Sequence, residues 1–280
     1  MPSFTSIISK LNDTISRFVW GTPMLIFFLF VGILFTIRIR FFQVTGFKEW
    51  MSNTILACFR RKDVVKTKEK NSISQWQALT TALASTSGTG NIAGVATALT
   101  AGGPGAIFWM WVSAFLGMMT HYAEIVLGHH YRYKDKNGNW VGGPMIYMER
   151  GLKSKTLACL FSFFCIIATL GIGNMSQSNS MAEAIHHTFG ISKLWVGTVT
   201  SIIVVLVIIG GVKRIASVSE KIVPFMSVLY IFGALIVIIM HLPNIPGAFG
   251  SIFKEAFNFK AAGGGILGYG ISVAVKKGIS

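Results

Sequence analysis

The sequence predicts an all-α integral membrane protein, a polytopic bundle of helices that cross the bilayer. Of its 280 residues, 52% are hydrophobic and only 12% are charged, whereas a soluble domain carries about 25% charged residues. The hydrophobic residues form long runs, and the charged residues lie mainly in the gaps between them. Such runs must be helices, because no water is available in the bilayer to satisfy open backbone groups.

Six apolar runs are long enough to cross a hydrocarbon core of about 30 Å. They are Phe18–Ile37, Ile73–Ala101, Ala106–Leu127, Leu157–Met175, Leu194–Val212 and Ile222–Leu242. A seventh run begins near Gly264 and is cut short. No small-residue cleavage site follows the first run, so we expect a membrane helix there rather than a cleavable signal.

The positive charges predict the orientation of these helices. Nine Lys and Arg lie in loop 38–71, six in 131–156 and three in 211–221, all on one side if the helices alternate. Because positive loops stay in the cytoplasm, the N-terminus is expected outside and loop 38–71 inside, in the cell (inner) membrane. Topology thus accounts for the net charge of +15, and no nucleic-acid partner is expected.

The second run, Ile73–Ala101, is unusual for a membrane helix. Its middle, Ser85–Gly94, reads STSGTGNIAG and has almost no bulky apolar side chains. Gly88 and Gly90 each weaken a helix by about 1 kcal/mol relative to alanine, and the hydroxyl side chains compete for backbone groups. The run is also longer than one straight crossing needs, so we expect a helix that is broken near the midplane.

A broken helix offers two kinds of binding group. Its second half presents free N–H groups and a positive dipole end, which suit a carboxylate, and its first half ends in free carbonyls, which suit sodium. Oxygen ligands of the right kind are supplied by Thr86, Ser87, Thr89 and Asn91. The alternative interpretation is close packing of a neighbouring helix on the GxxxG pair Gly90–Gly94.

Two further groups of polar residues lie in the predicted spans or at their ends. Asn174 and Gln177 follow each other at i, i+3 and are expected to face the bundle interior; the alternative is the polar outer end of a helix. In the third run, Glu124 lies at i+3 from His121 and is either part of an ion pair or a proton relay. The sequence shows no catalytic triad, acidic pair or metal-ligand cluster, so we expect neither an enzyme nor a cofactor.

Together these motifs resemble the alanine or glycine:cation (sodium) symporter family. The resemblance runs through Ser87–Trp111, Gly173–Ser180, Gly210–Ile215 and Glu220–Met226, and it covers nearly the whole chain. It implies a leucine-transporter-like fold, in which two inverted five-helix repeats follow one extra N-terminal helix. It also implies sodium-coupled uptake of a small neutral amino acid such as alanine or glycine, with membrane lipid around the protein.

The same resemblance implies a set of site residues. The residues expected at the substrate are Thr89, Gly90, Asn91, Asn174 and Gln177. The residues expected at the sodium ion, the coupling ion, are Ala84, Thr86 and Ser87. No catalytic residue and no metal other than sodium is implied. Where the family usually shows Lys before Tyr-Ala-Glu, this chain has His121.

The resemblance also divides the chain. Residues 1–72 would form the N-terminal helix and the basic cytoplasmic loop, 73–263 the first five-helix repeat with an outer loop, and 264–280 the start of an incomplete second repeat. The fold is therefore expected to be truncated after about one repeat, with only the N-terminal portion of the family present. A separate chain that supplies the second repeat would complete the transporter; the alternative is a non-transporting remnant or subunit.

Overall fold

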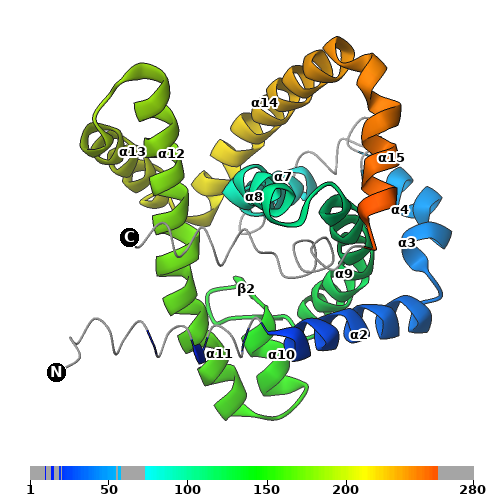
Figure 1. Cartoon of the computed structure of the whole chain (residues 1–280). Helices are drawn as coiled ribbons and strands as arrows, with labels where there is room; N and C mark the ends of the chain where they lie inside the picture. The colour runs from blue at the N-terminus through cyan, green and yellow to red at the C-terminus, as the bar shows by residue number, and fades with distance from the viewer. Residues whose placement is uncertain are drawn as a thin grey trace. The chain divides into compact units, whose positions relative to one another are not determined.

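The computed structural model describes residues 21–54, 56–57 and 73–257, together with residues 10, 14, 15 and 19. These residues form helices almost throughout, with one two-stranded hairpin (Figure 1). The basic cluster Arg60–Lys70 and the predicted start of a second repeat, 264–280, lie outside the described residues.

The chain forms two compact units. The first takes its residues from Met1–Phe47, Gly90–Ala123 and Pro243–Ser280, and the second from Lys48–Thr89 and Glu124–Leu242. Elements of the first are α2 (Thr22–Arg38), α3 (Phe42–Thr45), α8 (Ala93–Gly102), the first part of α9 (Gly105–His130) and α15 (Ile245–Glu255). The short 3-10 turns η1 (Thr89–Asn91) and η3 (Leu242–Asn244) lie where the chain passes between units.

In the first unit, α9 is packed against both α2 and α15. A Cβ added to Gly32 on α2 would lie 3.0 Å from the Cβ of Leu116 on α9. At the beginning of α9, the ring of Phe108 lies 5.9 Å from the ring of Phe253 on α15. Gly105 lets the backbones approach, because a Cβ there would be 2.3 Å from the carbonyl oxygen of Glu255. The chain that follows α14 thus contains a short helix, α15, which is packed on α9.

The second unit holds the remaining elements. They are α4 (Phe47–Asn53), α7 (Gln75–Thr86), the end of α9, β1 (Tyr133–Lys134), β2 (Trp140–Val141), α10 (Pro144–Arg150), α11 (Lys155–Ala168), η2 (Thr169–Met175), α12 (Ser176–Phe189), α13 (Lys193–Ile208) and α14 (Gly211–Met240). Helix α7 lies beside α14, α10 beside α11, and α13 contacts both α12 and α14 (Figure 1). The two strands pair antiparallel, with Tyr133 opposite Val141 and Lys134 opposite Trp140.

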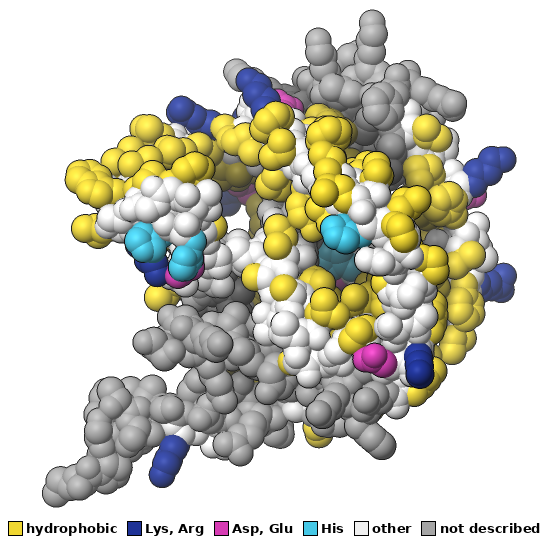
Figure 2. All heavy atoms as spheres, turned by 45° about the horizontal axis from the view of Figure 1, so that its top comes forward, with side chains coloured by type: hydrophobic (Ala, Val, Ile, Leu, Met, Phe, Trp, Pro, Cys, Tyr) yellow, Lys and Arg dark blue, Asp and Glu magenta, His cyan; other side chains and the backbone are white. Residues whose placement is uncertain are grey.

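Among the described residues, three helical stretches have the length and apolar composition to cross a membrane: Gly105–His130, Lys155–Phe189 and Gly211–Met240. Pro23–Arg38 and Lys193–Ile208 are apolar but shorter. Large apolar side chains on these helices are exposed, for example Leu194 at 78% and Met240 at 72%. Hydrophobic side chains cover much of the face shown in Figure 2. Apolar surface on this scale fits contact with lipid and confirms an all-α, multi-pass membrane protein.

Two of the predicted loops contain helix. Loop 211–221 was expected to connect two spans, but α14 already begins at Gly211, whose φ of 69° places it in the left-handed region that favours glycine. Lys213 and Arg214 continue the helix because long charged side chains are good helix formers, so a charged stretch need not be a loop. Within loop 38–71, the short helices α3 and α4 occupy part of residues 42–53.

Candidate functional site

The second apolar segment is broken, as predicted. Helix α7 ends at Thr86, the 3-10 turn η1 follows, and α8 starts again at Ala93. The break therefore falls in Ser87–Ile92, within the stretch rich in glycine and hydroxyl residues. We refer to Ser87–Ile92 as the break below.

Local hydrogen bonds explain why α7 stops. The hydroxyls of Ser85 and Thr86 donate to the Ala82 carbonyl at 2.8 and 3.0 Å, in competition with the backbone ladder. The N–H of Gly88 donates to the Thr86 carbonyl at 3.0 Å, and not to the carbonyl of Ala84, which lies four residues earlier and would accept it in a regular helix. As a result, the Ala84 carbonyl accepts no backbone hydrogen bond within the described part of the chain. Carbonyls released in this way are the groups that bind sodium at broken helices.

The three residues predicted for sodium lie together at the end of α7. Ala84 and Thr86 belong to its last turn, and Ser87 is its C-cap, with φ −84° and ψ 66°. All three are exposed. The Thr86 hydroxyl donates back into the helix, to the Ala82 carbonyl.

One side chain from a helix distant in sequence reaches the break. Gln177 on α12 accepts a hydrogen bond from the N–H of Thr89, with 3.4 Å between the nitrogen and Oε1. Its amide nitrogen lies over Gly88, where an added Cβ would be only 2.6 Å away. All three residues belong to the second unit. Gly88 thus leaves the room that the Gln177 amide occupies, and two of the predicted substrate residues, Thr89 and Gln177, are in contact.

The residues that follow Thr89 are exposed at the surface of the structure. Gly90 and Asn91 are exposed, and a Cβ added to Gly90 or Gly94 would meet no described atom within 4 Å. The GxxxG packing alternative therefore has no support in the described part of the chain. Helix α8 has Ile92 at its N-cap and no side-chain cap, so the backbone N–H groups of its first turn suit an anion.

A π-helix precedes Gln177. The segment η2, Thr169–Met175, joins α11 to α12 through wider turns with hydrogen bonds from i to i+5. Asn174 lies in this segment and is exposed, whereas Gln177 is half-buried. The prediction of a common face assumed 3.6 residues per turn. In the structure Gln177 reaches the break, whereas the side chain of Asn174 forms no hydrogen bond with any described residue.

His121 and Glu124 of α9 have different surroundings. His121 lines a cavity of about 230 Å³ between α2 and α9, where Ser113 and Thr120 add hydroxyl groups to an otherwise apolar wall. Glu124 lies in the second unit, near Tyr147 of α10. The pKa of Tyr147 is raised above its ordinary value, mainly by burial and to a smaller extent by the negative charge of Glu124. Among the described residues, no cluster of His, Cys, Asp and Glu has the makings of a metal site.

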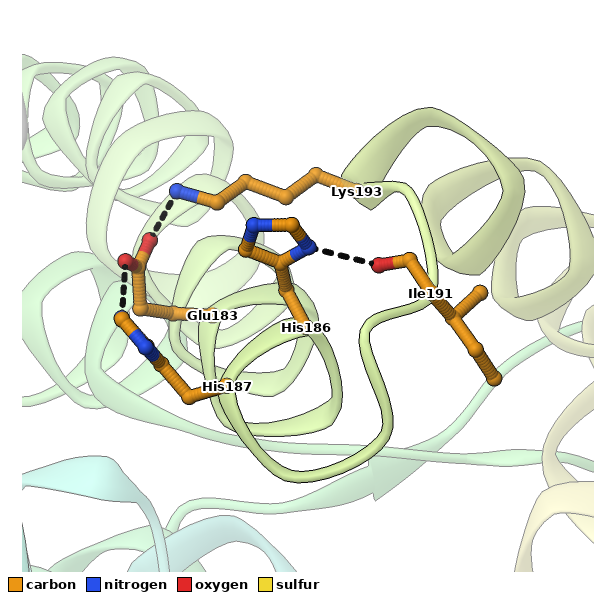
Figure 3. Close-up of polar contacts among 5 residues, drawn as sticks. All are labelled: Glu183, His186, His187, Ile191 and Lys193. Carbon is orange, nitrogen blue, oxygen red and sulfur yellow. Dashed lines mark hydrogen bonds and ion pairs between the residues drawn. The ribbon is translucent and has the colours of Figure 1, made fainter.

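A cluster of charged residues lies at the turn between α12 and α13 (Figure 3). The Glu183 carboxylate binds the Lys193 ammonium and lies 3.0 Å from Nε2 of His187. The Nδ1 atom of His186 lies 2.9 Å from the Ile191 carbonyl. These side chains are exposed, so the contacts order the turn without adding much stability. No sequence motif indicates this cluster, because a turn without distinctive residues separates Glu183 from Lys193.

Known proteins provide an independent comparison. A profile of the sodium:alanine symporter family matches residues 5–280. The chain is 47% identical over 274 residues to the sodium/alanine symporter AgcS of Methanococcus maripaludis, which covers 96% of this chain and 59% of that protein. It is 41% identical to the putative sodium/proton-dependent alanine carrier protein YrbD of Bacillus subtilis, in an alignment that covers 95% of this chain and 53% of that protein. It is 38% identical to the probable sodium/glutamine symporter GlnT of Bacillus subtilis, in an alignment that covers 98% of this chain and 55% of that protein.

These matches bear on two earlier expectations. The profile runs through residue 280 and does not bear out the expectation that only an N-terminal portion is present. The relatives likewise give no support to a separate chain that supplies a second repeat. The chain spans 59% or less of the length of these three relatives.

Proposed function

The chain belongs to the sodium:alanine symporter family, and from this premise we propose that it is a secondary active transporter for the sodium-coupled uptake of a small neutral amino acid. The observation that carries the proposal is the break, with Gln177 of α12 on the N–H of Thr89. Backbone N–H groups and carbonyls lie there within a few residues of each other, so one site offers groups to both an anion and a cation.

In this proposal the substrate carboxylate binds the N–H groups of Thr89 and Gly90. The Gln177 amide, which accepts from Thr89, turns to donate its own N–H to the carboxylate. Hydrogen bonds to an ionised group are about twice as strong as neutral ones, so the exchange favours the bound state. Asn91 and Asn174 complete the set of side chains around the substrate, and the open space beside Gly90 leaves room for it.

Sodium binds at the end of α7, to the Ala84 and Ser87 carbonyls and the Thr86 hydroxyl. The segment Ile73–Ala101 contains no Asp or Glu, so the protein supplies no negative charge of its own in this segment. The substrate carboxylate provides that charge when it binds at the other side of the break. Each ion then raises the affinity for the other, which is the physical requirement for symport.

The finer architecture is proposed on the same basis. The fold is leucine-transporter-like, with an N-terminal helix in 1–72, a first five-helix repeat in 73–263 and the start of a second repeat in 264–280. The protein lies in the cell inner membrane, with its N-terminus outside and loop 38–71 in the cytoplasm, because the Lys and Arg residues are concentrated on one side. Alanine and glycine are the proposed substrates, and glutamine is a competitor worth testing because one relative is named for it.

The test is uptake of labelled alanine by vesicles that contain the full chain. We expect uptake with an inward sodium gradient, little uptake when choline replaces sodium, and a loss of most uptake in Asn91→Ala. Sodium-dependent binding of alanine without uptake would instead support a non-transporting subunit. Protein that is present in the membrane and neither binds nor takes up alanine, glycine or glutamine would refute the proposal.

A further inference from the structure

The connection between α9 and α11 lies at a membrane surface. Helix α9 ends at His130 and α11 begins at Lys155, and both belong to stretches able to cross a membrane. The residues between them are therefore tied at both ends to the edge of the bilayer. They fold into the hairpin β1–β2 and the short helix α10, all within the second unit (Figure 1).

The hairpin has one exposed face that carries two cations and an indole. Arg132 directly precedes β1 and Lys134 is its last residue, and both side chains lie over the ring of Trp140. Trp140 stands opposite Lys134 on β2, and all three residues are exposed. The guanidinium carbon of Arg132 lies 4.3 Å, and the ammonium of Lys134 4.9 Å, from the centre of the Trp140 ring.

Contacts elsewhere in the connection hold this hairpin in shape. On its other face, the guanidinium carbon of Arg150 lies 3.6 Å from the centre of the Tyr133 ring, which joins α10 to β1. At the tip, Oδ1 of Asp135 accepts hydrogen bonds from the N–H groups of Asn137 and Asn139 at 2.9 and 2.8 Å. The exposed face is therefore preorganised rather than a mobile basic loop.

The two cations on the indole have no acidic partner in the structure as described. The nearest carboxylate in sequence, Asp135, is engaged within the hairpin tip, and no described carboxylate forms an ion pair with Arg132 or Lys134. Two positive charges held on one ring repel each other, and a bound anion removes that repulsion. Residues 131–154 as a whole carry five Lys or Arg and two Asp or Glu, so the connection attracts anions.

We propose that Arg132, Lys134 and Trp140 form a binding site for the phosphate headgroup of an anionic phospholipid. The guanidinium and ammonium groups bind the phosphate through charge-assisted hydrogen bonds. The indole occupies the depth at which tryptophan is enriched in membrane proteins and contacts the glycerol and upper acyl region. A lipid fits better than free phosphate, because the hairpin lies where lipid headgroups are concentrated and Trp140 adds an apolar contact.

The test is native mass spectrometry of the full chain in a neutral detergent. The protein is titrated with phosphatidylglycerol, with phosphatidylcholine of the same acyl chains and with inorganic phosphate. The variant Arg132→Gln with Lys134→Gln removes both cations. The matched control, Lys136→Gln with Lys153→Gln, removes the same charge from the same connection but leaves the two cations on the indole in place.

We expect the protein to retain phosphatidylglycerol in preference to the other two ligands. Loss of a cation near the membrane surface weakens binding by about five-fold, so the Arg132/Lys134 variant should bind at least ten-fold more weakly, with helix content unchanged. Trp140→Leu should bind lipid more weakly while keeping the charge. The charge-keeping exchange Arg132→Lys with Lys134→Arg should retain binding and shows that the hairpin tolerates substitution.

Three results would overturn the proposal. Equal losses in the test and control variants would mean diffuse attraction to the whole connection. Equal retention of phosphatidylcholine would remove the role of the anionic headgroup. Inorganic phosphate that displaces the lipid at equal concentration would mean a simple anion site without lipid recognition.

Discussion

Replacement of Gln177 by alanine tests the proposed substrate site most directly. Gln177 is half-buried, and its Oε1 accepts from the N–H of Thr89 at 3.4 Å, a long and therefore weak hydrogen bond. In the proposed bound state, its amide donates to the substrate carboxylate. The substitution removes both interactions without adding bulk at the break.

The magnitude follows from these two hydrogen bonds. A bond to an ionised group contributes about 1.5–3 kcal/mol, and the weak bond that must be broken first costs about 0.5 kcal/mol. The net loss of binding free energy in Gln177→Ala is therefore about 1–2.5 kcal/mol, which corresponds to an affinity for alanine about 5- to 70-fold weaker. Gln177→Glu should weaken binding further, because a second carboxylate repels the substrate and competes for Thr89.

The assay is equilibrium binding of labelled alanine to the purified full chain in sodium. Asn179→Ala is the matched control, because Asn179 lies on the same helix, is exposed, and its side chain forms no hydrogen bond with any described residue. Thermal unfolding of each variant verifies that the fold is kept. Unchanged affinity in Gln177→Ala would refute a contact with substrate, and tighter binding would show that Gln177 only competes for the Thr89 N–H.

Two further predictions concern glycines that make room for a neighbour. In Gly88→Ala the new methyl group would lie 2.6 Å from the amide nitrogen of Gln177. Because the Gln177 side chain is flexible, it should move away and the fold should be kept. We expect the affinity for alanine to fall several-fold in the same binding assay. In Gly105→Ala the methyl group would meet the backbone of Glu255 at 2.3 Å, which cannot move so freely. We expect a loss of about 1–3 kcal/mol in stability, with faster hydrogen exchange in α15.

Glycines with open surroundings provide the controls. No described atom lies within 4 Å of a Cβ added to Gly94 on α8 or Gly117 on α9, so alanine there should be neutral or stabilising because of its higher helix propensity. Equal effects of alanine at Gly88 and Gly94 on binding would contradict the steric account of the break. Unaltered exchange in α15 of the Gly105 variant would contradict close packing of α15 on α9.

The sequence predicts the features that depend on local composition. Long apolar runs predict the membrane helices, and the cluster of glycines and hydroxyl residues at Ser85–Gly94 predicts the break. The helices and the break can both be predicted because each depends on the preferences of residues that are neighbours in the sequence. The family resemblance also identifies Thr89 and Gln177, which the structure brings together.

Features that depend on tertiary contacts are beyond this kind of prediction. The charged stretch after Gly211 is helical because its long side chains tolerate a helix and α14 continues through it. The cation face of the hairpin depends on strand pairing that places Trp140 opposite Lys134. The different exposure of Asn174 and Gln177 depends on a change of helix type, which a fixed spacing of 3.6 residues per turn does not anticipate.

The π-helix at Thr169–Met175 has a consequence for how sequences of this family are aligned. A π turn accommodates one extra residue inside an otherwise α-helical stretch, while the helix that follows keeps its direction and facing. A relative with one residue fewer in this segment would continue as a regular α-helix and still turn the same side of α12 toward α7. A one-residue gap just before Gln177 is therefore no sign of a different site, and the glutamine should be matched by its place on α12 rather than by its distance from Cys165.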